Sequence, residues 1–571
     1  MVFIMAKGAS SPQGRNRPHP VANAESREVA GVKAERHPNP PSPLRSPLAI
    51  ALLGGLLMGL CPEPIRAWPL AWVALAPLWN VVTAPSSHWR PGWAFRLGLV
   101  WSLTYHGIVL SWITALHPLT WMGVPWLGSV AIALFAWAFI TGLGGVTFGL
   151  WAVLLRGVAV RLPVSPLGRI VIGTALWCAL ETILSWGPLY WPSLSFTQSP
   201  HNGWILHLGQ GSGPMAVTAA IVAVNGCWAE AYRALRPRPA SGASRQPVAW
   251  QLGALGIALF VGLHGLGLGL QAHQAADDSG QALRIGLIQG NIPTREKLTP
   301  AGVRQALERY TEGYRALVEA GADAVLTPEG AIPEIWHRRY QGNSPIYRAV
   351  LEEGVPLWLG TFRPTAETSF SSLTQSLVTL DGTGQVISQY NKVKLVPLGE
   401  YIPFQAVLGG LISRLSPIDS SLSPGTMDQV FETPFGIAIA GICYESAYSE
   451  LFRRQAAAGG EWIMTASNND PYPPRMMRQH HAQDVMRAIE SDRWAARVTN
   501  TGISGIVTPQ GKTRWLSEPN QTVTHLATIY RRQTRTLYVR WGDWLTPLLL
   551  GSSGIIGLRA VAKRRDRTLG E

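Results

Sequence analysis

A series of long apolar segments fills the first half of the chain and restricts its fold more than any other feature. Seven segments lie between residues 48 and 270, and an eighth lies near the carboxyl terminus. A helix that crosses a bilayer needs ~20 apolar residues, and most of these segments are close to that length. The sequence therefore predicts a polytopic α-helical membrane region of about eight spans. The segments are 48–60, 67–82, 95–116, 127–155, 170–186, 214–231, 250–270 and 544–561.

Basic residues predict how this region is oriented. The loops 117–125 and 187–213 contain no Lys or Arg, whereas the loops that alternate with them are basic. Because basic loops stay in the cytoplasm, we expect both termini to be cytoplasmic and residues 272–540 to lie on the opposite, outer face of the membrane. The same residues explain the net charge of +14, so no nucleic-acid partner is expected. They are Arg90, Arg96, Arg156, Arg161, Arg169, Arg233, Arg236, Arg238 and Arg245, with Arg559, Lys563, Arg564, Arg565 and Arg567 in the tail.

Composition divides the chain into four predicted parts. Residues 1–46 are rich in Pro, Ser, Ala and Arg and read as a disordered basic arm. Residues 47–271 form the membrane region with about seven spans. Residues 272–540 form an outer globular domain, and residues 541–571 hold the last span and a basic cytoplasmic tail.

The outer domain alternates predicted strands and helices. Periodicity of this kind allows several α/β folds. A hairpin is expected around the turn 381–384, and a second one around Asn500-Thr501-Gly502. The other expected strands are 283–289, 322–327, 355–361 and 462–466, and the expected helices are 302–320 and 476–493.

One cysteine lies where chemistry is possible. The apolar run 435–440 reads as a buried strand, and Gly441-Ile442-Cys443-Tyr444-Glu445 follows it directly. A thiol becomes a nucleophile when a base takes its proton and a fixed cation or donor stabilises the oxyanion. Two upstream segments offer these groups, Glu329 after the strand 322–327 and Lys392 after the hairpin. The remaining cysteines lie in or beside apolar segments, so no disulfide framework is expected.

The ordered set Glu329, Lys392 and Cys443 resembles the nitrilase superfamily, in which a Glu-Lys-Cys triad transfers acyl groups through a thioester. Five segments look more specifically like its apolipoprotein N-acyltransferase branch, and the similarity covers roughly residues 47–560. It implies an α-β-β-α sandwich for the outer domain, with a general base, an oxyanion-stabilising ammonium and a nucleophile in that order. The segments are IQGNIP at 288–293, TPEGAIP at 327–333, YNKVKLVPLGEYIPF at 390–404, GICYES at 441–446 and VTNTGISG at 498–505.

The same motifs contain three supporting candidates. The resemblance implies that glutamates at the positions of Glu400 and Glu445 support the triad or bind substrate. Tyr444 lies between the nucleophile and Glu445, and it either contributes to the same cavity or only packs.

Two residues compete with members of the triad. Glu334 follows Glu329 closely and is an alternative base. Lys394 competes with Lys392, but the eight-position interval between Lys392 and Glu400 favours Lys392. We expect Lys394 to be a solvated strand lysine.

A polar cluster on the predicted helix 476–493 suggests a metal site. His480 and Asp484 are four residues apart and share a helical face, and His481 is adjacent. No third ligand or HExxH pattern follows. We therefore expect a solvated helix face, and no metal or cofactor.

Two features leave their roles open. Glu181 lies in or near an apolar span, where a carboxylate is either functional or part of a helix end. The segment 467–474 (SNNDPYPP) departs from the family pattern of Asn-Asp, a small residue and two aromatics. That departure concerns the shape of a loop at the site and the choice of acceptor.

The resemblance implies a specific reaction. A membrane phospholipid would donate a fatty acyl chain to Cys443, and the α-amino group of a lipoprotein's amino-terminal diacylglyceryl cysteine would accept it. Two other readings remain. One is a membrane-tethered carbon-nitrogen hydrolase that uses water as acceptor. The other is a transporter or scaffold with an inactive outer domain.

Overall fold

The computed structural model describes residues 46–84, 90–236, 246–337, 341–366, 369–397, 399–401 and 422–569. Nearly all of the predicted basic arm lies outside the described residues, and so do Arg238, Arg245 and residues 402–404 of the longest motif.

The apolar segments form helices. Five helices in the described ranges, α4, α5, α8, α9 and α18, are long and apolar enough to cross a membrane. The three other expected segments form α1, α2 with the turn η2, and α3 with the turn η3, so the count of about eight spans stays a prediction. The helices are α1 (Pro47–Gly59), α2 (Ala76–Val82), α3 (Pro91–Val109), α4 (Trp126–Arg161), α5 (Pro166–Trp186), α8 (Pro214–Leu235), α9 (Gln246–Ala272) and α18 (Leu545–Leu569). Short turns join them at η2 (Trp68–Trp72), η3 (Ser111–Leu116), η4 (Thr120–Met122), η5 (Leu194–Thr197), α6 (Gly203–Leu206) and α7 (Gly209–Ser212).

The ends of several helices follow from local sequence. Proline occupies the first turn of α5, where a missing N–H is not needed and the fixed φ suits the helix. The side chain of Ser165 accepts a hydrogen bond from Gly168 N and caps the same end. Thr299 and Pro300 start α11 in the outer domain in the same way.

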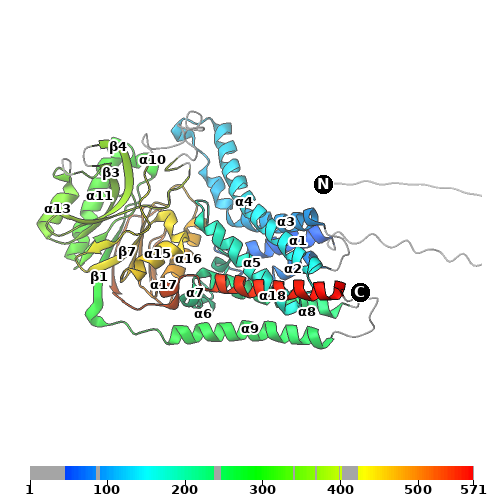
Figure 1. The fold of residues 1–571 in the computed structure, drawn as a ribbon. Helices are drawn as coiled ribbons and strands as arrows, with labels where there is room; N and C mark the ends of the chain where they lie inside the picture. Colours follow the sequence, from blue (N-terminus) through cyan, green and yellow to red (C-terminus); the bar gives the residue numbers. More distant parts are fainter. Residues whose placement is uncertain are drawn as a thin grey trace, which may run out of the picture. The chain divides into compact units, whose positions relative to one another are not determined.

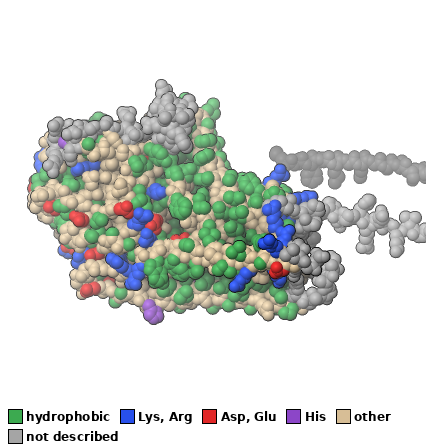
Figure 2. All heavy atoms as spheres, in the orientation of Figure 1, with side chains coloured by type: hydrophobic (Ala, Val, Ile, Leu, Met, Phe, Trp, Pro, Cys, Tyr) green, Lys and Arg blue, Asp and Glu red, His purple; other side chains and the backbone are tan. Residues whose placement is uncertain are grey.

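Basic side chains gather at one end of the helical region. Arg169, in the first turn of α5, pairs with Glu230 of α8 at 2.5 Å. Arg564 of α18 donates to the carbonyl of Arg161, at the end of α4, at 3.0 Å. Figure 2 shows apolar side chains over much of the helices and basic ones gathered toward the right-hand end of the view. This is the charge distribution that the positive-inside rule associates with one membrane face.

Residues 282–530 contain two six-stranded sheets. Their strand orders are β12-β1-β2-β3-β4-β5 and β11-β10-β9-β8-β7-β6. The pairs β1–β2, β2–β3, β7–β8 and β8–β9 are parallel, so their carboxyl ends share one edge of each sheet. The strands of the first sheet are β1 (Ala282–Gln289), β2 (Ala324–Leu326), β3 (Leu357–Ala366), β4 (Ser369–Leu380), β5 (Val386–Asn391) and β12 (Val523–Tyr530). Those of the second are β6 (Phe431–Thr433), β7 (Gly436–Ile442), β8 (Ile463–Ser467), β9 (Ala495–Thr499), β10 (Gly505–Val507) and β11 (Thr513–Leu516).

The central strands are buried on both faces, because each sheet packs against the other sheet and against helices. Leu287 of β1 belongs to the core between the sheets, and its neighbour Ile288 packs under α11 and α13. Ala440 of β7 belongs to the same inter-sheet core, and Ile439 packs with residues of α15 and α16. These layers confirm the predicted α-β-β-α sandwich (Figure 1). The helices of the domain are α10 (Thr294–Lys297), α11 (Pro300–Glu319), α13 (Pro345–Glu353), α15 (Ser449–Ala457), α16 (Pro474–Ser491) and α17 (Leu537–Trp541), with the turns η6 (Ser279–Gln281) and η8 (Cys443–Ala447).

Helix α16 is polar in sequence but buried on all sides. Gln479 donates to the carbonyl of Val109 at the end of α3, while Asp484 pairs with Arg497 of β9. The expectation of a solvated face for His480, His481 and Asp484 is therefore wrong. The sequence of α16 is polar, but the helix lies between the second sheet and the helical region. A helical pattern does not reveal that the helical region covers its other face.

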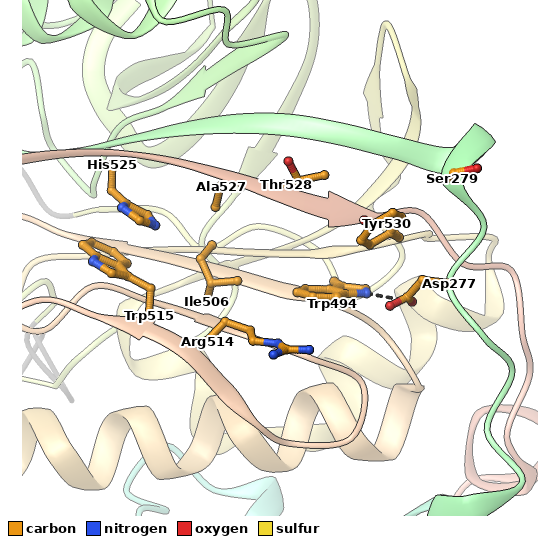
Figure 3. A pocket seen from close by; sticks show the side chains of 10 residues that line it. All are labelled: Asp277, Ser279, Trp494, Ile506, Arg514, Trp515, His525, Ala527, Thr528 and Tyr530. Atoms are coloured by element: carbon orange, nitrogen blue, oxygen red, sulfur yellow. Dashed lines mark hydrogen bonds between the residues drawn. The ribbon is translucent and has the colours of Figure 1, made fainter.

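The edge strands β11 and β12 were not among the expected strands. They pair antiparallel with β10 and β1 and end the two sheets on the same side. A cavity of about 580 Å³ lies between them. Figure 3 shows Trp515 and His525 stacked at one end of the cavity, and Trp494 donating to Asp277 at the other. None of the candidate site residues lines this cavity.

Arg497→Met is expected to destabilise the protein strongly, because it leaves the Asp484 carboxylate buried without its cation. Both side chains are only 1% exposed. Removing one partner of such a pair destabilises by about 3–5 kcal/mol, whereas an exposed pair contributes about 0–1 kcal/mol. Thermal unfolding in detergent measures the difference, with Arg315→Met in the exposed Arg315–Glu352 pair as the control. Equal unfolding midpoints for the two variants would contradict this account of α16.

Candidate active site

Three of the predicted residues meet where strands of both sheets end. Glu329 follows β2, Lys392 follows β5, and Cys443 follows β7. The Lys392 ammonium donates to Glu329 Oε1 at 2.7 Å and to Glu400 Oε1 at 2.6 Å. Of the six candidate site residues, the structure thus brings Glu329, Lys392, Glu400 and Cys443 together. Glu400 is held in turn by the backbone N–H of Val396, at 2.9 Å from Oε2.

The Lys392 side chain is completely buried between its two carboxylates. Burial alone would lower the pKa of Lys392, but the negative charges of Glu329 and Glu400 outweigh it and hold that pKa well above its usual value. Burial raises the pKa of Glu400, and the Lys392 ammonium opposes this shift. The lysine therefore stays charged at neutral pH, as a fixed cation beside Cys443.

Cys443 is a buried thiol in a constrained backbone. Its φ of 53° lies in the left-handed region, which non-glycine residues seldom adopt. Burial, followed by the negative charge of Glu329, raises the pKa of Cys443 to about 12. At neutral pH the sulfur is therefore protonated, and it needs a base before it can attack.

Asn468 connects the thiol with the carboxylate. Its backbone N–H donates to Glu329 Oε2 at 2.9 Å, and its carbonyl accepts from Cys443 Sγ at 3.7 Å. Its side chain is tied to Thr294 and Asn500. The sequence marked this residue only as part of an unusual loop. The available signal was its place after β8, next to the strand that carries the cysteine.

Glu445 fastens the cysteine segment to the lysine segment. Oε1 accepts from the backbone N–H groups of Val393 (2.6 Å) and Lys394 (3.1 Å). Oε2 accepts from Ile442 N (2.7 Å) and Tyr390 Oη (3.0 Å). Burial raises the pKa of Glu445 to about 7, against these hydrogen bonds. Glu445 therefore supports the geometry of Cys443 and Lys392 by binding backbone N–H groups beside them and the hydroxyl of Tyr390.

Tyr444 faces the helical region. Its hydroxyl lies 2.8 Å from the carbonyl of Pro188 and 2.9 Å from that of Tyr190, both in the segment after α5. Its ring is parallel to that of Trp191, with centroids 6.1 Å apart. The structure therefore places Tyr444 as a contact between the cysteine turn and the helices, outside the charged cluster.

The two competing residues lie elsewhere. Glu334 is exposed to solvent. Lys394 is partly buried, donates to the carbonyl of Trp186 at 3.1 Å and lies 4.6 Å from the centre of the Tyr448 ring. Lys394, expected to be solvated, is therefore only partly so, because the last turn of α5 covers part of its side chain.

A second buried lysine lies close to Glu329. Lys297 donates to the carbonyl of Gly330 at 2.9 Å, and burial lowers the pKa of Lys297 to about 8. Sequence analysis did not select it. Its position shortly after the IQGNIP motif, in the short helix α10, was the available signal.

Glu181 has a structural environment. Its carboxylate accepts from Ser193 Oγ (2.6 Å), Trp177 Nε1 (3.1 Å) and Thr218 Oγ1 (3.2 Å). It also accepts from the backbone N–H of Leu194 at 3.2 Å. These bonds hold the segment after α5, which in turn contacts Tyr444.

Within the described ranges, no three His, Cys, Asp or Glu side chains are grouped to hold a metal ion.

Two family models match the chain. The apolipoprotein N-acyltransferase N-terminal domain matches residues 54–227, and the carbon-nitrogen hydrolase domain matches residues 284–536. Among solved structures, an amidase from Nesterenkonia sp. is similar, with 17% identity and a TM-score of 0.35. That alignment covers 48% of this chain and 97% of the amidase.

Curated relatives match nearly the whole length. The apolipoprotein N-acyltransferase of Nostoc sp. is 50% identical over 87% of this chain and 96% of its own length. The apolipoprotein N-acyltransferase of Thermosynechococcus vestitus is 45% identical over 88% of this chain and 93% of its own length. With both domain models in order along one chain, this protein belongs to the apolipoprotein N-acyltransferase family.

Proposed function

We propose that this membrane enzyme transfers a fatty acyl chain from a phospholipid to the α-amino group of a lipoprotein's amino-terminal diacylglyceryl cysteine, through a thioester on Cys443. The observation that carries the proposal is the buried Lys392, held between Glu329 and Glu400 beside Cys443. Relatives named for this acyl transfer match the chain from the membrane helices to the outer domain. That match favours an acyltransferase over a hydrolase that uses water.

In the first step, Cys443 attacks the ester carbonyl of a phospholipid. Glu329 takes the thiol proton as the S–C bond forms, since a thiol with a pKa of about 12 cannot supply enough thiolate at neutral pH. The Lys392 ammonium stabilises the negative charge that develops on the carbonyl oxygen. The ester C–O bond then breaks, and the lysophospholipid leaves with the proton from Glu329.

In the second step, the free α-amine of the lipoprotein attacks the thioester. Glu329 accepts a proton from the amine as the C–N bond forms, and returns it to the departing Cys443 sulfur. The amide product leaves, and the thiol and the carboxylate are back in their starting states. Such a double displacement predicts ping-pong kinetics.

Glu400 sets the charge of the site. The Glu329 carboxylate neutralises the Lys392 ammonium only while it is ionised. The Glu400 carboxylate keeps the ammonium in place while Glu329 gains and loses its proton. The Lys392–Glu400 contact at 2.6 Å persists through that cycle in this proposal. We therefore assign Glu400 and Glu445 to support, and Glu329, Lys392 and Cys443 to chemistry.

The membrane helices suit lipid substrates. Moving an acyl chain from a bilayer into water costs about 0.8 kcal/mol per CH₂ group, so a site at the bilayer surface avoids a large barrier. We place the protein in a bacterial inner membrane with the outer domain on the periplasmic face and both termini in the cytoplasm. The gathering of Arg169, Arg564 and other basic residues at one helix end supports that orientation.

Incubation with phospholipid is expected to add one fatty acyl group to the protein, because the thioester accumulates without an acceptor amine. Intact mass measures the adduct, and hydroxylamine should remove it. Cys443→Ala should gain no mass, while Cys227→Ala, a buried cysteine of α8, serves as the matched control and should gain it. An adduct that persists in Cys443→Ala would exclude this nucleophile.

Glu329→Gln is expected to slow thioester formation at pH 7 by ~10³-fold, within the usual range for removing a general base. Its rate should then rise about tenfold per pH unit between pH 7 and 9, because only preformed Cys443 thiolate reacts and burial still raises the pKa of Cys443 in this variant. The wild-type rate should change little over that range, since Glu329 supplies the base. Parallel pH profiles for the two proteins would rule out Glu329 as the base.

Labelling of intact cells tests the orientation. In a Cys443→Ala background, Glu308→Cys lies on the exposed face of α11, and Lys563→Cys lies on exposed α18. A membrane-impermeant maleimide is expected to label position 308 once the outer membrane is opened, and position 563 only after the inner membrane is also broken. Labelling in the reverse order would show that the outer domain lies in the cytoplasm.

A further inference from the structure

His480 contacts the backbone of the candidate nucleophile. Its Nε2 lies 2.7 Å from the carbonyl oxygen of Cys443, and its side chain is completely buried. We propose that His480 is a positioning residue, which holds the Cys443 backbone in its left-handed conformation by donating to this carbonyl. This inference rests on the proposed role of Cys443 as nucleophile.

The contacts define the proton on the imidazole. A carbonyl oxygen can only accept, so Nε2 of His480 must carry hydrogen. On the other side of the ring, Nδ1 lies 3.1 Å from Nδ2 of Asn469, an amide nitrogen that can only donate. Nδ1 is therefore the acceptor, and the ring is the neutral Nε2–H tautomer. Burial lowers the pKa of His480 to about 3, which agrees with a neutral ring.

Cys443 needs such a contact. With φ at 53°, it is one of few non-glycine residues with a left-handed backbone among those described. Glu445 binds the N–H of Ile442 on the amino side, at 2.7 Å. His480 binds the carbonyl on the other side. The His480 contact fixes the peptide group between Cys443 and Tyr444, and the Glu445 contact fixes the one between Gly441 and Ile442, one residue earlier. Between these two fixed peptide groups, the backbone of Cys443 and the direction of its sulfur are restricted.

His480 itself is held firmly. Asp484, one turn later in α16, pairs with Arg497 of β9 and accepts from Thr465 Oγ1 of β8 at 3.3 Å. The Trp191 ring packs against the imidazole, with centroids 5.5 Å apart. The helix therefore cannot slide along the sheet without breaking a buried ion pair, and the imidazole keeps its distance from the cysteine carbonyl.

A positioning role makes a specific kinetic prediction. Both half-reactions use the same sulfur in the same orientation, so loss of the contact should slow both by a similar factor. Phospholipid affinity should change little, because His480 lies behind the cysteine backbone. A residue that only stabilised the fold would instead reduce the amount of folded enzyme and leave kcat per folded molecule unchanged.

Two amide substitutions separate these cases. In His480→Gln the amide nitrogen can occupy the place of Nε2 and donate to the carbonyl. In His480→Asn it can reach only the place of Nδ1. His481→Asn is the matched control. His481 is next to His480 in the chain, but its imidazole bonds to Thr513 of β11 at 2.9 Å and not to the cysteine backbone. The readouts are the rate of thioester formation at saturating phospholipid, its KM, and the rate of Cys443 alkylation by iodoacetamide, each per folded molecule.

We expect His480→Asn to lower the acylation and alkylation rates by about 100-fold with KM within threefold. His480→Gln should recover to within tenfold of wild type, and His481→Asn should stay within threefold. Equal rates in the Asn and Gln variants would overturn the inference.

If His480→Asn does not fold, ¹⁵N NMR of histidine-labelled wild type decides, with His480→Gln used to assign the signal. Hydrogen on Nε2 supports the inference, and an Nδ1–H tautomer, whose Nε2 carries no hydrogen, contradicts it. A wild type that alkylates but never acylates would instead refute the proposed function.

Discussion

The structure of the site depends on one buried ammonium. A charged lysine in a protein interior is strongly unfavourable unless it is paired and hydrogen-bonded. Lys392 meets this condition with two carboxylates from separate segments, Glu329 after β2 and Glu400 in the segment after β5. The chain must therefore bring these segments to the edge of the sandwich where β7 delivers Cys443. The sandwich fold, the hydrogen bonds of Glu445 to both the lysine and the cysteine segments and those of the Asn468 backbone all hold that arrangement.

The cysteine turn is supported from two directions. On one side, Tyr444 and Lys394 contact backbone carbonyls at the end of α5 and just after it. Behind the turn, α16 is buried between the second sheet and the helices, and His480 reaches the Cys443 carbonyl from there. The cysteine turn is thus fixed against the helical region as well as against its own sheet. A change in the segment after α5 would therefore alter the position of the cysteine turn through these contacts.

The sequence predicted the parts of the site that follow regular elements. Glu329 and Cys443 each come after a short apolar run, so the sequence placed both at strand ends. Their strands, β2 and β7, lie in different sheets, and the prediction that the two residues meet came from the family resemblance. The choice of Lys392 over Lys394 needed the motif, because both positions follow the same strand. Asn468 was missed because it acts through its backbone N–H and carbonyl, which no side-chain pattern reveals.

Other misreadings have a common cause. His480 and Asp484 were expected in solvent because a polar helix usually has a wet face, and only tertiary packing shows that α16 is covered on both sides. Lys394 is less solvated than expected for the same reason, since nothing local shows that the end of α5 covers part of it. The edge strands β11 and β12 are only partly buried, so their periodicity is weak.

A single-turnover experiment tests the central claim, that Cys443 stores an acyl group for an amine, most directly. Enzyme in excess of a phospholipid labelled in both its acyl chain and its head group is mixed without acceptor, and the two products are followed in time. The account predicts a burst of lysophospholipid equal to the enzyme that carries acyl group, no free fatty acid, and quantitative transfer when a diacylated lipopeptide with a free amine is added. Release of fatty acid at the rate of lysophospholipid formation would contradict it, because water would then be the acceptor.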